Sequence, residues 1–225
     1  MPIRNIPLIT NDIYHVVNRG VAQQGTFDDR HDYQHFIELM TYYQIQEIPM
    51  RYSYFVRLPF KEKQEFMATI LNKENKRVYV EIIAYCLMPN HIHLLLKQST
   101  TNGISNFMRY LSNSYTRYYN EKRRRIGPLF QGRFKAVRIE TTEQLLHVSR
   151  YIHLNPYSAF IVKSLDELKK YSYSSLGEYL KTSDASICAK ENVLTHFDQS
   201  SYFDFIHDNA EYQRELQTIK NLLLE

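Results

Sequence analysis

One long β-rich run of the chain reads Arg77-Val-Tyr-Val-Glu-Ile-Ile-Ala-Tyr-Cys-Leu-Met-Pro-Asn-His-Ile-His-Leu-Leu-Leu-Lys97. Its β-branched and aromatic residues favour strands, and Pro89-Asn90 interrupts them, because proline cannot donate to a sheet ladder. We therefore predict a strand over 77–88, a turn, and a second strand over 91–97. Side chains alternate faces along a strand, so His91 and His93 are expected on one face and Ile92 on the other.

Periodic patterns on either side of this run predict the other elements of the core. They are a strand over 12–18, helices over about 31–46, 105–124 and 142–155, and a strand over 134–139. Each helix begins near a capping residue: Asp28 or Asp29, Asn102 or Ser105, and Thr141 or Thr142. The resulting βαββαβ order, followed by one more helix, favours an α+β fold in which an antiparallel sheet carries helices on one face.

Residues 49–76 interrupt that order. They contain Pro49, Pro59, an aromatic cluster and a short helical pattern, which indicates an insertion with a helix of its own. After the core, short helices and loops lead to an amphipathic helix near 210–224. We predict one domain over residues 1–180, with the insertion at about 49–76, and a helical C-terminal extension over 181–225.

Composition indicates an ordinary globular protein of the cytoplasm. The 225 residues are 44% hydrophobic and 23% charged, and no apolar stretch approaches the ~20 residues that span a bilayer. The N-terminus lacks the apolar core of a signal peptide. Cys86 and Cys188 lie far apart and are expected to be reduced thiols. No membrane partner is expected.

The charge is only mildly basic but is unevenly distributed. The net charge of +4 permits a nucleic-acid partner without requiring one. Between Arg109 and Arg138 there are nine Lys or Arg residues and a single acid, Glu121, which suggests one positive face. The chain also has 19 tyrosines, a residue that can stack on bases or act as a nucleophile, although most of them must be ordinary half-buried residues.

The two histidines provide part of a metal site. A catalytic divalent metal needs a further ligand and an open position for a substrate oxygen. Tyr151 and Asn155 lie at positions i and i+4 of a predicted helix, so they share a face about 6 Å apart. Asn155 can offer an amide oxygen to the metal while Tyr151 presents its phenol beside it. A nearby cation stabilises the charge that develops when a phenol attacks phosphorus.

Three motifs, in this order, resemble those of the single-tyrosine HUH transposases. They are Met88-Pro-Asn-His-Ile-His-Leu-Leu-Leu-Lys97, Gly127-Pro-Leu-Phe-Gln-Gly-Arg-Phe-Lys135 and Tyr151-Ile-His-Leu-Asn-Pro156. The resemblance is to the REP-associated tyrosine transposase and IS200-like transposase branch. It extends from about Ile13 to Tyr179, and Tyr173-Ser-Ser-Leu-Gly-Glu-Tyr179 resembles a later element of the family.

The resemblance implies a fold, an activity and a set of site residues. The fold is a ferredoxin- or RRM-like HUH fold. His91, His93 and Asn155 would bind Mg²⁺ or Mn²⁺, and Tyr151 would attack single-stranded DNA to give a 5′-phosphotyrosine link and a free 3′-OH. Attack by another 3′-OH would then rejoin the ends without ATP. The implied partners are DNA hairpins at element ends, bound by a monomer or a homodimer in which Tyr151 serves its own chain or its partner.

Five basic residues are the predicted DNA contacts: Arg19, Arg123, Arg125, Arg133 and Lys135. Arg133 and Lys135 follow a glycine-containing loop near the expected site, and Arg19 lies just after the first predicted strand. The run that includes Arg123 and Arg125 can equally be a solvated helix end, where cations favour the helix dipole.

Other readings of the motif residues are open. The histidine pair alone can be two polar residues on a solvated strand face. His153 is offset from Tyr151 along the helix and is expected in a surface or capping role. Tyr115, Tyr118 and Tyr119 are rival nucleophiles, with core packing or base stacking as their simpler role.

Two other functions compete with an active transposase. A replication or mobilisation relaxase has the same kind of site but is generally a larger protein. A non-cleaving, domesticated protein that binds single-stranded nucleic-acid hairpins needs only a sheet that presents aromatic side chains. A covalent adduct that requires both metal and Tyr151 separates cleavage from mere binding.

Overall fold

The computed structural model describes residues 7–71, 77–183, 185–197 and 201–222 of the chain. The strands within these residues are β1 (Ile13–Arg19), β2 (Val80–Met88), β3 (His91–Gln98) and β4 (Lys135–Ile139). The helices are the short 3-10 turn η1 (Val21–Gln23), α1 (Arg30–Tyr43), α2 (Tyr52–Phe55), α3 (Phe60–Leu71), α4 (Gly103–Arg123), α5 (Thr142–Ser158), α6 (Leu165–Lys169), α7 (Leu176–Tyr179), α8 (Glu191–Leu194), α9 (Tyr202–His207) and α10 (Ala210–Leu222).

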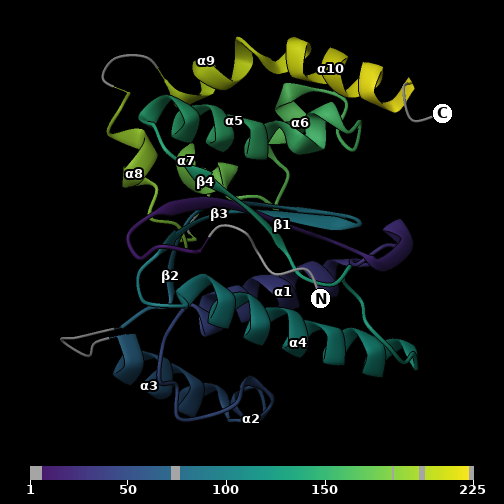
Figure 1. The fold of residues 1–225 in the computed structure, drawn as a ribbon. Coiled ribbons are helices and arrows are strands. Elements are labelled where there is room, and N and C mark those ends of the chain that lie inside the picture. Colours follow the sequence, from purple (N-terminus) through teal and green to yellow (C-terminus); the bar gives the residue numbers. More distant parts are fainter. Residues whose placement is uncertain (1–6, 72–76, 184, 198–200, 223–225) are drawn as a thin grey trace.

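The described strands form one antiparallel sheet in the order β2-β3-β1-β4 (Figure 1). β2 and β3 make a hairpin in which Met88 lies opposite His91. β1 lies between β3 and β4, so that Val17 is opposite both His93 and Lys135. This connectivity is that of ferredoxin-like folds, and the predicted α+β class with an antiparallel sheet is confirmed.

Helices cover both faces of the sheet. α1 and α4, the two helices of the βαββαβ core, lie on one face. α5 packs on the other face, with α6 beside it and with α9 and α10 above it (Figure 1). The two helices of the βαββαβ core therefore lie on one face, as predicted, and α5, which follows the core, covers the other face. The physical reason is visible in β2 and β3, which are buried along nearly their whole length and so need cover on both sides.

A cluster of charged residues ties α1 to the end of α4. Asp29 caps α1 by accepting from the Asp32 backbone N–H, and the Asp32 carboxylate is fully buried. Lys122 donates to Asp32 at 2.8 Å, and Arg123 pairs with the same carboxylate. Burial alone would raise the pKa of Asp32, but the hydrogen bonds from Lys122, the Asp28 backbone and Arg123 outweigh it and lower that pKa to about 2.

α5 carries Tyr151 and Asn155, the two helical residues predicted at the site. Thr141 caps it by accepting from the Gln144 N–H at 3.1 Å. The helix does not end at Asn155 as predicted but continues through Pro156 to Ser158. Proline leaves the Ile152 carbonyl without its usual N–H donor, and the side-chain amide of Asn155 approaches that carbonyl at 3.5 Å.

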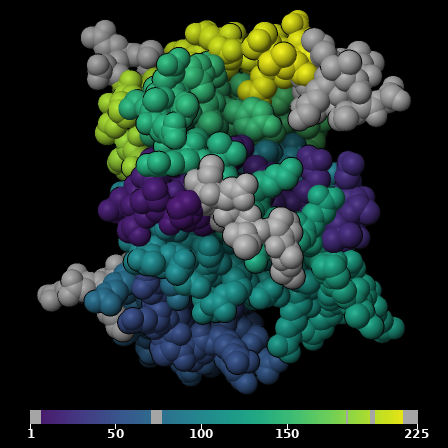
Figure 2. Space-filling view, in the orientation of Figure 1, coloured from purple at the N-terminus to yellow at the C-terminus, as the bar shows by residue number. Residues whose placement is uncertain are grey.

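The insertion and the C-terminal extension lie at opposite ends of the molecule. Figure 2 shows the insertion in blue at one end and the C-terminal helices in yellow at the other. α2 packs on α1 through the rings of Tyr42, Tyr52 and Phe55. α9 contacts α5, where Arg150 donates to the Phe205 carbonyl at 3.2 Å. A domain limit at residue 180 stays a prediction, and residues 72–76 of the insertion and 223–224 of the last predicted helix lie outside the described residues.

Two further sequence predictions bear on the environment of the site. Cys86 and Cys188 are both buried free thiols, as expected. No helix among the described residues is long and apolar enough to cross a membrane.

Candidate active site

The histidine pair lies on the face of the sheet that α5 covers. His91 and His93 point to the same side of β3, and their ring centroids are 4.8 Å apart. Across the ladder, Arg19 is opposite His91 and Val17 is opposite His93. The predicted alternation is confirmed, because Ile92 is fully buried towards the other layer.

Tyr151 extends from α5 towards these histidines. Its ring meets the His93 ring edge to face, with centroids 5.6 Å apart, and the phenol side chain remains 38% exposed. The structure therefore brings together two side chains that lie 58 positions apart in the sequence. A partly exposed phenol beside two imidazoles can be reached by a substrate strand.

The hydrogen bond of His91 defines its tautomer. Its Nδ1 lies 2.6 Å from the Asn90 side-chain oxygen, which can only accept. The orientation of that amide is supported by its nitrogen, which donates to the Gln23 carbonyl at 3.2 Å. The neutral form of His91 then carries its proton on Nδ1 and its lone pair on Nε2.

His15 is a site residue that the sequence did not single out. It lies on β1, diagonally across from His93, and its Nε2 is 3.0 Å from the Nδ1 of His93. The two rings stack with centroids 5.2 Å apart, and the His15 ring also meets that of Tyr151 at 6.0 Å. Burial lowers the pKa of His15 to about 4, so it is neutral at pH 7. The one available signal was its place in a strand with alternating faces, and that signal does not reveal which strand lies beside it.

Asn155 follows Tyr151 by one helical turn and is 7% exposed. Its side-chain nitrogen donates to the Tyr151 carbonyl at 2.8 Å. This bond leaves the amide oxygen as the atom that can accept a hydrogen bond or bind a cation.

These donors fit a divalent metal. Among the described residues, no group of three or more His, Cys, Asp or Glu side chains is placed to hold a metal ion, so His15, His91 and His93 do not make a three-histidine centre. The ligand set predicted from the sequence is therefore the two imidazoles of β3 with the Asn155 amide oxygen. Nitrogen and neutral oxygen donors suit first-row divalent ions, and the carbonyl oxygen suits Mg²⁺ and Mn²⁺.

The electrostatic environment of Tyr151 combines burial with one positive charge. Burial raises the pKa of Tyr151 above its usual value of 10.0, and the charge of Arg19 acts in the opposite direction. The phenol is therefore protonated at pH 7. Arg19, which the sequence predicted as a DNA contact, belongs to this site.

Lys135 is the second predicted DNA contact on this face. It lies on the same side of the sheet as His93, because Val17 of β1 is opposite both residues. Lys135 and His93 are therefore two strand spacings apart, about 10 Å. α5 does not cover this part of the sheet: Val137 is 64% exposed, and Arg19 and Lys135 are exposed as well. Tyr151 is therefore next to an uncovered part of the sheet that carries two exposed cations, Arg19 and Lys135.

The other predicted DNA contacts lie elsewhere. Arg133 lines a groove of about 910 Å³ between α4 and the loop before β4. Arg123 is held by Asp28 and Asp32, and its guanidinium stacks on the Tyr119 ring. Arg125 donates to the Asn120 side chain at 2.8 Å and to the Pro128 carbonyl at 3.2 Å. Arg123 and Arg125 thus stabilise the end of α4, on the far side of the sheet from Tyr151.

The rival tyrosines are structural. Tyr115 is fully buried and donates to the Thr26 carbonyl at 2.6 Å. Tyr118 donates to Asp32 at 3.0 Å, and Tyr119 donates to Asp28 at 3.1 Å. All three lie on α4, so the sheet separates them from the histidine pair.

His153 does not have the predicted surface role. It is fully buried, with Nδ1 2.8 Å from the Tyr202 hydroxyl and Nε2 2.7 Å from the Ser175 hydroxyl. Burial lowers its pKa to about 3, so it is neutral. Tyr202 belongs to the C-terminal extension, 49 residues away, and no local pattern could have indicated that contact.

Known proteins resemble this chain in its fold and in part of its sequence. None of the curated proteins matches this sequence. One solved structure with a similar fold is that of a REP-associated tyrosine transposase bound to a REP hairpin. The similarity has a TM-score of 0.53 and 16% sequence identity, and covers 89% of this chain and 96% of that chain.

The family model described as IS200-like transposase matches residues 42–155. That range is half of the chain, and it contains the histidine pair, Tyr151 and Asn155 but neither His15 nor the C-terminal helices. The resemblance seen in the three motifs is thereby confirmed, and the chain belongs to the IS200-like transposase family.

Proposed function

We propose that this protein is a transposase that cleaves and rejoins single-stranded DNA at hairpin-bearing element ends, in the cytoplasm. The observation that carries the proposal is the contact between Tyr151 and His93, whose ring centroids lie 5.6 Å apart in a member of a transposase family. The hairpin as partner is supported by the REP hairpin in the structurally similar transposase.

His91, His93 and Asn155 would hold Mg²⁺ or Mn²⁺. This assignment is supported by the tautomer of His91 and by the hydrogen bond of the Asn155 side-chain nitrogen, which leaves the amide oxygen as the acceptor. A bound divalent ion polarises the scissile phosphate and stabilises the charge that develops on it.

Tyr151 is the proposed nucleophile. Its phenol oxygen forms a bond to phosphorus, and the bond from phosphorus to the 3′ oxygen breaks, which leaves a 5′-phosphotyrosine and a 3′-OH. The phenol loses its proton and the departing oxygen gains one. Because one phosphodiester replaces another, a second 3′-OH can reverse the step and join new ends without ATP.

Arg19 and Lys135 are the proposed backbone contacts next to Tyr151. Both are exposed cations on the open part of the sheet, where they can pair with phosphates without disturbing the fold. Arg133, in its own groove, is proposed to contact DNA further from the scissile bond.

His15 is proposed as a positioning residue for His93. If Nδ1 of His93 donates to Nε2 of His15 across their 3.0 Å separation, the lone pair of His93 is on Nε2, as in His91. Metal-binding histidines commonly use such a partner to fix tautomer and ring orientation.

The tyrosine is proposed to act on the histidines of its own chain. The ring contacts of Tyr151 with His15 and His93 are within one chain, and α9 and α10 hold α5 in place. A monomer with this arrangement has a complete set of site residues.

The test is a gel assay for a covalent protein–DNA adduct. Purified protein is mixed with labelled single-stranded DNA from the flanks of its own gene, with Mg²⁺ or Mn²⁺ and, separately, with EDTA. Wild type is compared with Tyr151→Phe and with the matched control Tyr119→Phe, which removes a phenol oxygen on the other side of the sheet.

Adduct that disappears with EDTA and with Tyr151→Phe, and persists with Tyr119→Phe, supports the proposal. Adduct that survives Tyr151→Phe would refute the assignment of the nucleophile. Tight hairpin binding without adduct on any flank would identify a hairpin-binding protein that does not cleave.

A further inference from the structure

A polar pocket, separate from the groove at Arg133, lies on the side of the sheet away from Tyr151. It has a volume of about 420 Å³ and is formed where α2 of the insertion meets α1 and α4. Figure 1 shows α2 and α4 on the opposite side of the sheet from α5. Nothing in the proposed cleavage chemistry uses this pocket, although residues 51–57 of the insertion form much of its wall.

Positive charge dominates the lining. Arg51 and Arg57 come from the two ends of α2, and Arg117 comes from α4. Among the lining residues, all of which the structure describes, Glu121 is the single acid. The ion pairs found within the described residues include none of the three arginines. This contrasts with Arg123, six residues further along α4, which two carboxylates hold.

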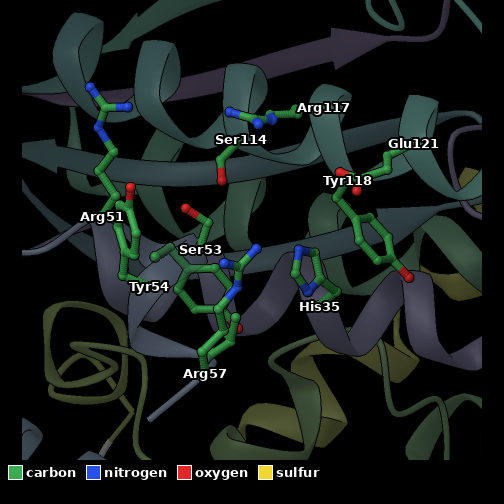
Figure 3. Close-up of a pocket in the computed structure, with 11 residues that line it drawn as sticks. His35, Arg51, Ser53, Tyr54, Arg57, Ser114, Arg117, Tyr118 and Glu121 are labelled. Carbon is green, nitrogen blue, oxygen red and sulfur yellow. The ribbon is translucent and has the colours of Figure 1, made fainter.

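The remaining lining supplies hydroxyls and aromatic faces. In Figure 3 the hydroxyls of Ser53 and Ser114 are directed into the space between α2 and α4, with Tyr54 at one end and His35 and Tyr118 at the other. At that end the His35 and Tyr118 rings stack on each other with centroids 3.9 Å apart. Guanidinium groups and hydroxyls are the donors that phosphates accept from, and tyrosine faces stack on bases.

The pocket is too open for a small free ligand. Tyr54 is 59% exposed and all three arginines are exposed, whereas small-molecule sites bury most of their ligand. A strand that is already anchored elsewhere on the protein does not need such enclosure, because its local concentration near the pocket is high. The exposure of the pocket and the absence of its three arginines from the ion pairs among the described residues therefore favour a segment of a polymer as its ligand.

We infer that this pocket holds a nucleotide of a DNA strand whose other part is bound at the catalytic site. Arg51, Arg57 and Arg117 contact its phosphates, and the face of Tyr54 stacks on a base. The inference rests on the proposed function, since the strand must first be bound at the face that carries Tyr151.

The experiment measures hairpin affinity by fluorescence anisotropy over a range of salt concentrations. The hairpin is used with and without a single-stranded extension of about 16 nucleotides, on its 5′ or its 3′ side. The variant Arg51→Gln/Arg57→Gln/Arg117→Gln is compared with wild type and with Lys61→Gln/Lys163→Gln/Lys170→Gln. That control makes the same change in charge at exposed lysines outside the pocket.

We expect one of the extensions to tighten binding by wild type and by the lysine control about tenfold, and to give the arginine variant no gain. The salt slope for the extended hairpin should fall by about two units in the arginine variant, since each single-strand phosphate contact contributes about 0.7. An extension that carries 5-iododeoxyuridine should crosslink to Tyr54 under light, and Tyr54→Leu should abolish that crosslink.

Equal gains from the extension in the two triple variants would overturn the inference, as would crosslinks that map away from α2. Free dAMP is included as a competitor: if it displaces the extension at micromolar concentration, the pocket is a site for a small nucleotide and the polymer assignment is wrong. The adduct assay is run on the same samples. Adduct formation by the wild type with no effect of the arginines refutes this inference alone, whereas absence of adduct and of hairpin binding refutes the proposed function.

Discussion

The two faces of the sheet carry similar side chains in different surroundings. On the face covered by α1 and α4, the hydroxyl of Tyr115 is fully buried against a backbone carbonyl, and Arg123 is paired with buried Asp32. On the face covered by α5, Tyr151 remains 38% exposed beside His93. Exposed cations adjoin it without acidic neighbours in the strand ladder.

This difference shows that the type of a residue does not determine its role in this protein. A phenol or a guanidinium whose hydrogen-bonding capacity is satisfied internally stabilises the fold. The same group becomes available for chemistry where the chain leaves it beside an open surface. The predictions below test this difference by changing residues on one face or on the other.

The largest expected effect is on cleavage. His93→Ala should lower the rate of adduct formation roughly 10⁴-fold, about 5 kcal/mol, because it removes a proposed ligand of the metal that stabilises the transition state. His31→Ala, at an exposed histidine of α1, should leave the rate unchanged. Single-turnover rates at saturating Mn²⁺ measure both. A His93→Ala rate within tenfold of wild type would contradict the proposed metal site.

The next effect is on stability and is confined to the other face. Asp32→Asn should lower the free energy of unfolding at pH 7 by about 3 kcal/mol, because it leaves Lys122 and Arg123 without their buried partner. Asp166→Asn, at an exposed carboxylate of α6, should change it by less than about 0.5 kcal/mol. Urea denaturation provides the comparison, and the rate of adduct formation by folded Asp32→Asn should equal that of wild type.

Acid should remove the Asp32 contribution in a defined range. The pKa of Asp32 is lowered from 3.8 to about 2 in the folded protein, so the unfolded chain binds a proton first as pH falls. The stabilisation is complete above pH 3.8 and is lost as pH falls towards 2. Urea denaturation between pH 5 and 2 should therefore show a steeper decline for wild type than for Asp32→Asn, and parallel curves would contradict the ion-pair account.

A smaller effect is expected at His15. His15→Ala should weaken Mn²⁺ binding by roughly 10- to 100-fold, the usual cost of losing the partner that orients a metal-binding histidine. His15→Gln, which retains an acceptor oxygen, should recover most of that affinity. Calorimetric titration of Mn²⁺ measures the loss, and hairpin affinity in EDTA should be the same for all three proteins. Unchanged Mn²⁺ affinity in His15→Ala would show that the contact with His93 is only packing.

The smallest effect separates two basic residues. Lys135→Gln should weaken binding of single-stranded DNA about threefold and reduce the salt slope by about 0.7, whereas Arg123→Gln should leave the slope unchanged. Fluorescence anisotropy titrations over a range of salt concentrations measure the affinity and the salt slope of both variants. A lower slope for Arg123→Gln would mean that DNA displaces Asp28 and Asp32 from that arginine.

The same comparison explains what could be predicted from the sequence. The strands, the alternation of His91 and His93, and the spacing of Tyr151 and Asn155 are local patterns. They indicated the fold class, and the resemblance of the three motifs at 88–97, 127–135 and 151–156 indicated the family. His15 was missed because its contact with His93 depends on which strands are neighbours, a property of the whole sheet.

Long-range partners account for the other differences. Arg123 looked like a DNA contact because Asp28 and Asp32, more than 90 residues earlier, are not visible as its partners in the sequence. His153 looked like a surface residue for the same reason. The position of α5 on the second face follows from two-sided burial of β2 and β3, which their nearly continuous apolar runs already indicated.

The hydrogen bonds that join α5 to α10 have a kinetic consequence. Gln213 of α10 donates to the Tyr151 carbonyl at 3.2 Å, and Glu211 of the same helix accepts from Tyr157, so the helix that bears the nucleophile is fastened to its own chain. Under the proposed function, the strand breakage that follows DNA binding is a first-order event. Dilution of the protein then slows its encounter with DNA, while the half-life of a strand that is already bound stays the same.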